Sequence, residues 1–192
     1  MHTRPLLLTS VLLLAACSAL PKGDVSFQDM IKNPLFAQNY YSDLTEHFVN
    51  LQIHNDPSMS DAAMKKIADS ARAEALAKAQ EASTIVNAGI HGDFIGAGEE
   101  VRGIALLADG NLYFGPDFMV IPAGELHVYT TLSADPRDGT FPGEQDTDVG
   151  PVKLAYGAQT YVLPPVTEKP GQMTVVLYDK MLKRIHAFAQ LR

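Results

Sequence analysis

Residues 101–114 read VRGIALLADGNLYF, two apolar runs separated by Asp109-Gly110. An Asp-Gly pair between apolar segments is the strongest short-range signal for a tight β-hairpin. Short runs rich in Val, Ile, Leu, Tyr and Phe continue to the C-terminus, separated by Gly, Pro and Asp, which is typical of a β-sandwich or barrel. Besides residues 101–108 and 112–114, the expected strands are 126–131, 152–156, 160–163, 174–178 and 184–189. The loop over residues 133–150 is longer than most, so we expect it to be functional or an ordered flap.

The residues before this β region have a helical pattern. Pro34 suits the first turn of a helix, and apolar side chains recur from it at helical spacing as far as Leu51. A second helix is predicted over residues 61–86, where alanines recur every three or four positions. We expect Ser58 to begin a capping box at the start of this helix, and Gly89 to end the helix.

The predicted fold class is therefore α+β. We expect a helical hairpin over residues 27–91, followed by an all-β sandwich or barrel-like domain over residues 92–192. The composition, 46% hydrophobic and 19% charged, is that of a globular protein. The formal net charge is −7 and no run of Lys or Arg forms a phosphate-binding stripe, so nucleic acid is not an expected partner.

Residues 1–16 have the features of an export signal. Arg4 precedes an apolar run over residues 6–16, which at about 1.5 Å per residue is far shorter than the roughly 30 Å hydrocarbon core of a bilayer. The run ends in Leu14-Ala15-Ala16-Cys17, which resembles the lipobox of bacterial lipoproteins. In those proteins a diacylglycerol is attached to the cysteine thiol and the leader is cleaved just before it. The alternative is a conventional signal peptide followed by an incidental cysteine.

Acylation of Cys17 would determine both the location and the chemistry of the mature chain. Each buried methylene contributes about 0.8 kcal/mol, so two or more acyl chains anchor a protein stably, and residues 17–26 would form the lipidated end and its tether. Ser18 follows the cysteine, which by the same resemblance favours the outer membrane of a Gram-negative bacterium, facing the periplasm or the cell surface. Cys17 is the only cysteine, so its acylation would leave no thiol for redox chemistry, disulfides or zinc.

No catalytic pattern is recognisable in the sequence, and whether the chain is an enzyme stays open, with a non-enzyme favoured. No G-x-S-x-G elbow occurs, and Gly96-Ala97-Gly98 precedes Glu99-Glu100, whose charge would repel a phosphate. The six histidines are scattered over separate segments. His127 is expected to point outward from its strand, on the same face as Glu125 and Tyr129.

The long loop is acidic and presents one candidate metal site. Clustered carboxylates with carbonyl oxygens suit calcium, which an exported domain meets at high concentration. Arg137 lies inside the would-be cage, and the alternative is a solvated loop whose Asp residues form turns. The calcium candidates are Asp135, Asp138, Asp146 and Asp148, with Glu144 nearby.

Several segments of the β region occur in an order that matches a known family. They are DGNLYF (109–114), DF (117–118), GELHVY (124–129), DVG (148–150), GAQTYVLP (157–164), VVLY (175–178) and FAQL (188–191). Together they resemble the DM-thirteen domain, an all-β extracellular module with a suggested role in electron transfer. The positions that carry the resemblance are Asp109, Gly110, Asp117, Phe118, Gly124, Leu126, Val128, Tyr129, Gly150, Gly157, Gln159, Tyr161 and Pro164, and Asp179 marks the position where the family usually has a cysteine.

Two departures from the family bear on function. Asp179 replaces the cysteine on which a redox role was chiefly argued, and Glu99 stands near a position where many members have histidine. The resemblance therefore implies the fold more strongly than electron transfer. No cofactor is implied by the sequence itself.

These observations favour a lipid-anchored protein of the cell envelope with a non-catalytic β-domain that binds a partner, possible partners being other envelope proteins. One alternative is an envelope electron-transfer protein, which would need a bound cofactor because the mature chain lacks a thiol. Another alternative is a calcium-dependent adhesion domain built on the acidic loop.

Overall fold

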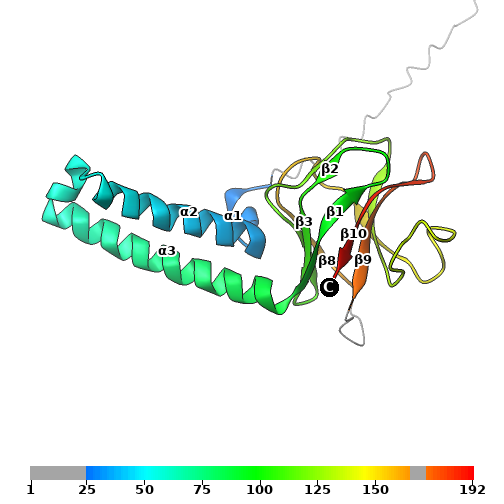
Figure 1. Ribbon diagram of the computed structural model, residues 1–192, viewed down its shortest axis with the longest axis horizontal. Helices are drawn as coiled ribbons and strands as arrows, with labels where there is room; N and C mark the ends of the chain where they lie inside the picture. Colours follow the sequence, from blue (N-terminus) through cyan, green and yellow to red (C-terminus); the bar gives the residue numbers. More distant parts are fainter. Residues whose placement is uncertain (1–24, 165–171) are drawn as a thin grey trace, which may run out of the picture.

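The computed structural model describes residues 25–164 and 172–192 (Figure 1). Cys17, and with it the expected leader and most of the tether, lies outside the described residues. Two long helices extend from one side of a β-domain, so the α+β class expected from the sequence is confirmed. No helix among the described residues has the length and hydropathy needed to cross a membrane.

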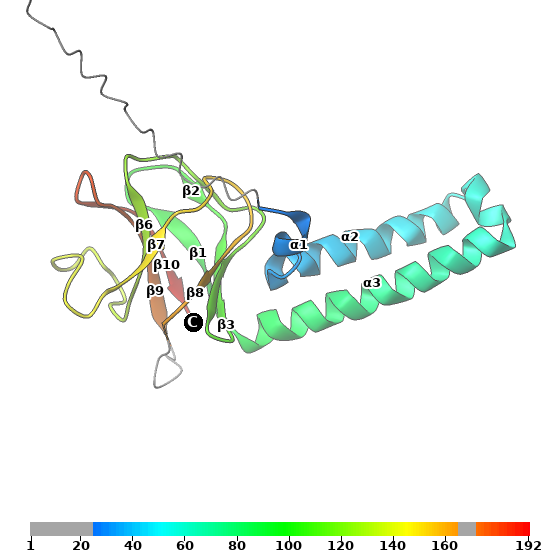
Figure 2. The ribbon, with the colours of Figure 1, turned by 180° about the vertical axis from the view of Figure 1, so that it is seen from behind.

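The helical part begins with the short helix α1 (Phe27–Met30), continues with α2 (Pro34–Ile53) and the 3-10 turn η1 (Pro57–Ser60), and ends with α3 (Ala62–Ala88). Figures 1 and 2 both show α2 and α3 side by side: α2 runs away from the β-domain, and α3 runs back to it. We call this pair of helices the arm; the 27 residues of α3 make it about 40 Å long. Alanines form the buried seam of α3, which lets the two backbones approach closely: Ala68, Ala75, Ala79 and Ala82.

The caps of the helices differ from the expectation at one point. Asp61, and not Ser58, is the N-cap of α3, and its carboxylate accepts hydrogen bonds from the backbone N–H groups of Ala63 and Met64. Ser58 lies inside η1, where Asp56 accepts its N–H. The predicted capping box was wrong because the turn after Asp56 is itself a separate short helix.

Asn33 joins the arm to the β-domain. Its side-chain oxygen caps α2 by accepting the N–H of Leu35 at 3.0 Å, while its amide nitrogen donates to the carbonyl oxygens of Phe114 at 2.8 Å and Gln159 at 3.2 Å. Asn33 is almost fully buried. Leu35 packs beside it against Leu106 and other apolar residues of the β-domain, so the base of the arm is fixed in place.

The β-domain is an antiparallel sheet that nearly closes into a barrel, with strand order β7-β6-β9-β10-β1-β3-β4-β8. A two-stranded ribbon, β2-β5, lies at one end. The strands are β1 (Ile90–Gly96), β2 (Val101–Arg102), β3 (Ile104–Ala108), β4 (Asn111–Phe114), β5 (Met119–Val120), β6 (Leu126–Thr131), β7 (Thr147–Pro151), β8 (Gln159–Val162), β9 (Met173–Asp179) and β10 (Arg184–Leu191).

Most expected strands are present, with three corrections. The hairpin at Asp109-Gly110 is confirmed, and both residues have positive φ, as this tight turn requires. The run over residues 101–108 is broken at Gly103, where a Cβ would lie 2.6 Å from the Phe118 backbone. Strand β1 begins one residue after Gly89 and was not predicted. Residues 152–156 do not form the expected strand, and β7 precedes them instead.

Side chains take the place of strand pairing where the barrel fails to close. Strands β7 and β8 are the two edges of the sheet, and the segment after β7 runs past β8 without a backbone ladder. The Gln159 amide accepts the N–H of Lys153 at 3.1 Å and donates to the Leu154 carbonyl at 2.9 Å. The Tyr161 hydroxyl also accepts the Lys153 N–H at 3.1 Å and donates to Gln159. These bonds satisfy backbone groups that an open edge would leave unpaired.

Side chains fill the inside of the barrel and cover part of its outer face. Three phenylalanines, Phe94, Phe114 and Phe118, pack at ring distances of 4.7–5.2 Å inside the barrel. On the outer face the long loop folds back, and Phe141 packs on Tyr129 and Tyr178 at 5.4–5.6 Å. The loop is therefore an ordered flap, and Tyr129 is buried beneath it instead of facing solvent.

Candidate functional site

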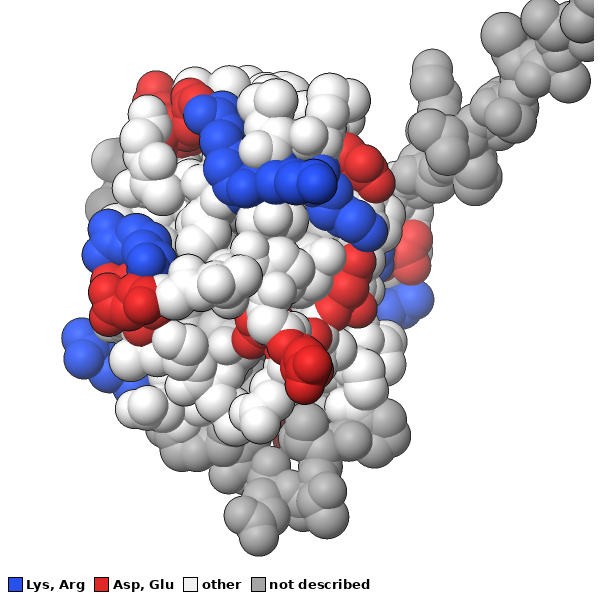
Figure 3. All heavy atoms as spheres, turned by 90° about the vertical axis from the view of Figure 1, so that its right-hand side faces the viewer, with Lys and Arg blue, Asp and Glu red and all other residues white. Residues whose placement is uncertain are grey.

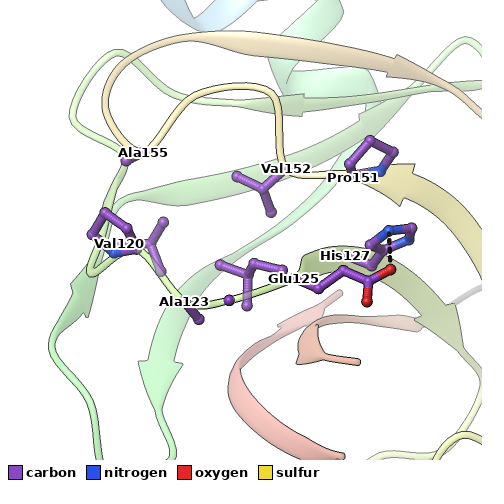
Figure 4. A pocket seen from close by; sticks show the side chains of 10 residues that line it. Val120, Ala123, Glu125, His127, Pro151, Val152 and Ala155 are labelled. Carbon is purple, nitrogen blue, oxygen red and sulfur yellow. Dashed lines mark ion pairs between the residues drawn. The ribbon is translucent and has the colours of Figure 1, made fainter. Parts of the chain in front are cut away.

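An open depression of about 330 Å³ lies between the loop that connects β5 to β6 and the segment that follows β7. Figure 4 shows Val120 and Ala123 on one side, Val152 on the other, and the side chains of Glu125 and His127 at one end. The walls are apolar and the end is charged. A binding site of this kind holds an apolar group and orients it through a few polar contacts.

Glu125 and His127 form the polar end of the depression, and Asp148 and Lys180 are linked to them outside its lining. We call these four side chains the rim network. His127 Nδ1 lies 2.9 Å from Asp148 Oδ1, and its Nε2 lies 3.8 Å from Glu125 Oε1. Lys180 Nζ donates to Asp148 Oδ2 at 3.2 Å. The network joins β6, β7 and the turn after β9, so its geometry depends on the pairing of β6 with β7 and β9 and not on one loop.

The position of Asp148 is set by an irregularity between β6 and β7. Val128 pairs with Gly150 and Tyr129 with Asp148, so Val149 is an extra residue in β7, and Gly150 has a φ of 129°. The bulge turns Asp148 toward His127. Burial opposes ionisation of this carboxyl, but hydrogen bonds from His127 and Lys180 outweigh it and lower the pKa of Asp148. Burial and the Asp148 charge raise the pKa of Tyr129 to about 12.

The turn that connects β9 to β10 adds an exposed apolar surface beside the depression. Met181 and Leu182 at this turn, the hairpin tip, are 64% and 58% exposed. Gly124, on the wall of the depression, lets the tip approach, because a Cβ there would lie 2.6 Å from the Met181 sulfur. Figure 3 views this end of the molecule, opposite the arm, and shows uncharged surface bordered by a band of Lys and Arg and by separate groups of Asp and Glu.

A buried polar pair lies behind the hairpin tip. Asp179 is fully buried at the end of β9, and its Oδ1 accepts the N–H groups of Met181 and Leu182 at 2.9 and 3.1 Å. His186 is almost fully buried at a bulge in β10, between Ile185 and Ala187. Burial lowers the pKa of His186, and among the described residues its two ring nitrogens and Asp179 Oδ2 have no hydrogen-bond partner.

The arrangement suits the binding of a partner. In the described part of the chain, the side-chain partners of the His127 ring are carboxylates, so the imidazole has no hydroxyl or thiol to activate as a nucleophile. His186 is not among the residues that line the depression. Charged groups that are already paired are suited to hold and align a partner at the edge of an apolar contact.

The structure does not bring the calcium candidates together. Asp135 binds Arg137 within the flap, and this pairing lowers the pKa of Asp135 to about 2. Asp146 accepts the N–H of Gly143, and Asp148 belongs to the rim network. Asp138 donates its backbone N–H to Asp135 within the same turn. Residues 25–164 and 172–192 contain no group of three or more metal-ligating side chains.

The positions that carry the family resemblance are spread over the barrel and serve its geometry. Some form turns or bulges with special backbone angles (Asp109, Gly110, Gly150, Gly157), and some pack in the core or its sheet (Phe118, Leu126, Val128, Tyr129). Gln159 and Tyr161 close the barrel, and Gly124 admits Met181. Asp117 precedes the buried Phe118, and Pro164 is exposed beyond β8. Asp179 caps the hairpin turn, so at this position the carboxylate has a structural task.

Three features of this region were missed in the sequence. His127, Glu125 and Asp148 were each noted, but their meeting depends on pairing between β6 and β7, and β7 was not predicted. Nothing local marked His186 as buried, because the bulge that turns it inward has no sequence signal of its own. The Arg184–Glu99 ion pair at 2.9 Å also joins residues 85 positions apart.

Comparison with known proteins finds no matching family model, no similar curated protein and no similar solved structure.

Proposed function

We propose that the chain is a lipid-anchored protein of the bacterial cell envelope, most simply of a Gram-negative outer membrane, whose barrel binds a protein partner without catalysing a reaction. The observation that carries the binding role is the apolar depression beside the exposed hairpin tip, with the rim network at its border. An apolar centre with a charged edge is the usual anatomy of a protein interface.

The chemistry of the surface narrows the class of partner. The depression accepts one or two apolar side chains, and Glu125, which is exposed and only 3.8 Å from the His127 ring, can receive a basic group or an N–H donor from the partner. We therefore propose a protein segment with an apolar residue beside a Lys or Arg as the ligand. Met181 is a flexible apolar side chain, which suits an adaptable contact at the same edge.

The arm adds a second feature to this proposal. We propose that α2 and α3 act as a rigid helical hairpin, because Asn33 and Leu35 fix its base on the barrel. The described chain begins at that base, so the arm extends beside the anchored end and not between the anchor and the barrel. We propose that the arm reaches outward from the anchored end, and that it does not separate the barrel from the bilayer.

The resemblance to the DM-thirteen domain is retained as part of the proposal for the barrel. Its support is that the matching positions serve turns, core packing and barrel closure. The electron-transfer alternative gains no support from Asp179, which is engaged in the hairpin turn. The calcium alternative is weakened because its four carboxylates hold other partners or lie apart.

Site-specific photo-crosslinking tests the binding surface. A photoreactive amino acid replaces Leu182 at the hairpin tip or Ala123 in the depression, and Val162, which is 79% exposed on β8, serves as the matched control. On irradiation of intact envelopes we expect one adduct of the same mass from positions 182 and 123 and none from position 162. Absence of an adduct at both sites, or an equal adduct at position 162, would overturn the proposed surface.

A further inference from the structure

Four aromatic rings gather where the described chain begins. Phe27 of α1 lies 6.1 Å from Phe36 and 5.0 Å from Tyr40 of α2, and Phe36 and Tyr40 stack 6.1 Å apart. Tyr41 continues the group at 5.2 Å from Tyr40, and Lys78 of α3 lies over its ring. We call these rings the aromatic cluster.

The aromatic cluster is not part of a buried core. Phe27 is 41% exposed and Tyr40 is 37% exposed, and none of the four rings belongs to the three buried clusters of the described chain. Helix α1 has only four residues, too few to be stable alone, and none of them is buried. Rings held in contact but left half-open to water form an apolar surface that no residue of the described chain covers.

Covalent geometry limits what can lie opposite this surface. Residues 18–24 separate Cys17 from Val25, and a chain spans at most about 3.3–3.6 Å per residue, so the described chain begins within about 25–30 Å of the cysteine. If Cys17 carries acyl chains, the bilayer lies within that radius of the aromatic cluster. The far end of the arm, where Ile53 is exposed, is up to about 30 Å further away along the 20 residues of α2.

The side chains of the cluster suit the surface of a bilayer. Phenyl rings favour the upper acyl region, and tyrosine places its ring there with the hydroxyl among the headgroups. Lys32 is well exposed beside α1 and can extend its ammonium toward lipid phosphates, and it also neutralises Asp29 at 3.1 Å. Lys78 lies over Tyr41 from the neighbouring helix.

We infer that the aromatic cluster rests on the bilayer surface and sets the orientation of the anchored protein, with Phe27 as its deepest side chain. This inference rests on the proposed lipid anchor. The lipid supplies the affinity, and the aromatic contact fixes which side of the molecule faces the membrane. The hairpin tip then points away from the aromatic cluster and is free to meet a partner.

Tryptophan fluorescence in vesicles tests the inference, because the natural chain contains no tryptophan. Phe27→Trp reports on the aromatic cluster, Ile53→Trp on the far end of the arm and Val162→Trp on the barrel. Each full-length protein is produced with its leader, purified with its lipid and reconstituted in phosphatidylethanolamine–phosphatidylglycerol vesicles with or without brominated acyl chains. Thermal melting first confirms that the three variants fold alike.

We expect brominated lipid to remove most of the emission at position 27 and little of it at positions 53 and 162. Recovery of the protein with the vesicles but equal quenching at all three positions, or stronger quenching at position 53, would overturn the inference and leave the anchor intact. Failure of the protein to float with the vesicles would instead remove the anchor, and the inference with it.

Discussion

The arm and the barrel reach their stability by different means. The barrel packs large side chains on both faces of its sheet, with Phe114, Phe118 and Phe188 almost fully buried. The arm buries chiefly alanines between two helices that have no third layer over them. Alanine favours the helix but removes little apolar area from water. We therefore expect the barrel to owe its stability to its own core, and the arm to depend on its attachment at Asn33.

The largest loss of stability is expected from a cavity inside the barrel. Phe114→Ala removes a ring that contacts Phe94, Phe118 and Tyr161 at 4.7–5.3 Å, and we expect it to lower the free energy of unfolding by about 3–5 kcal/mol. Urea unfolding followed by circular dichroism measures the loss. A loss below about 1 kcal/mol would show that this cluster is not the core of the barrel.

The attachment of the arm is tested at Asn33. Asn33→Ala removes the α2 cap and leaves two buried carbonyl groups without their donor, so we expect a loss of about 2–3 kcal/mol. Hydrogen exchange should become faster over the first turns of α2 and along β4. Asn33→Asp separates the two effects, because it keeps the capping oxygen and removes the amide donor. If both variants exchange like the natural chain, Asn33 does not attach the arm.

A matched cap at the far end of the arm should matter less. Asp61→Ala removes the N-cap of α3 but no bond to the barrel, so we expect a loss of about 1 kcal/mol. Faster exchange should be confined to the start of α3, as mass spectrometry of deuterated peptides can show. If the free energy of unfolding fell as much as in Asn33→Ala, the stability of the arm would not depend mainly on its attachment at Asn33.

The smallest expected effect is a change in the pH dependence of stability when the buried His186 is replaced. Burial lowers its pKa below the ordinary 6.5, opposed by the charges of Glu99 and Asp179 and assisted by Arg184. Around pH 6 the unfolded chain therefore binds more protons at this site than the folded chain, and stability falls as the pH falls below about 6.5. His186→Leu cannot titrate, and its unfolding free energy should change less between pH 7 and about pH 5. An equal pH dependence in both proteins would assign the effect to other groups.

Local signals predicted the fold well where structure depends on neighbouring residues. Asp109-Gly110 indicated its hairpin, and strand β6 was expected at its observed bounds. The failures occur where distant residues decide the structure. Residues 152–156 have the composition of a strand, but Gln159 and Tyr161 satisfy part of their backbone, and β1 is hidden because it follows α3 almost directly.

The candidate site was less accessible to sequence reasoning than the fold. Outward orientation of His127 was expected; its ring does lie at the rim, but it is only 16% exposed beside its two carboxylate partners. Its partner Asp148 was assigned instead to a calcium loop, since the bulge at Val149 that turns it toward β6 depends on strand pairing. The role of Asn33 could not be predicted from the sequence, because its two barrel partners lie 81 and 126 residues further along the chain.

The proposed location, orientation and lack of thiol chemistry all depend on one covalent bond. Intact-mass and peptide mass spectrometry of the protein taken from membranes tests it directly. We predict a mature chain that begins at Cys17 and carries a diacylglycerol on its sulfur. A chain that retains residues 1–16, or that begins elsewhere with a free thiol at Cys17, would contradict the account.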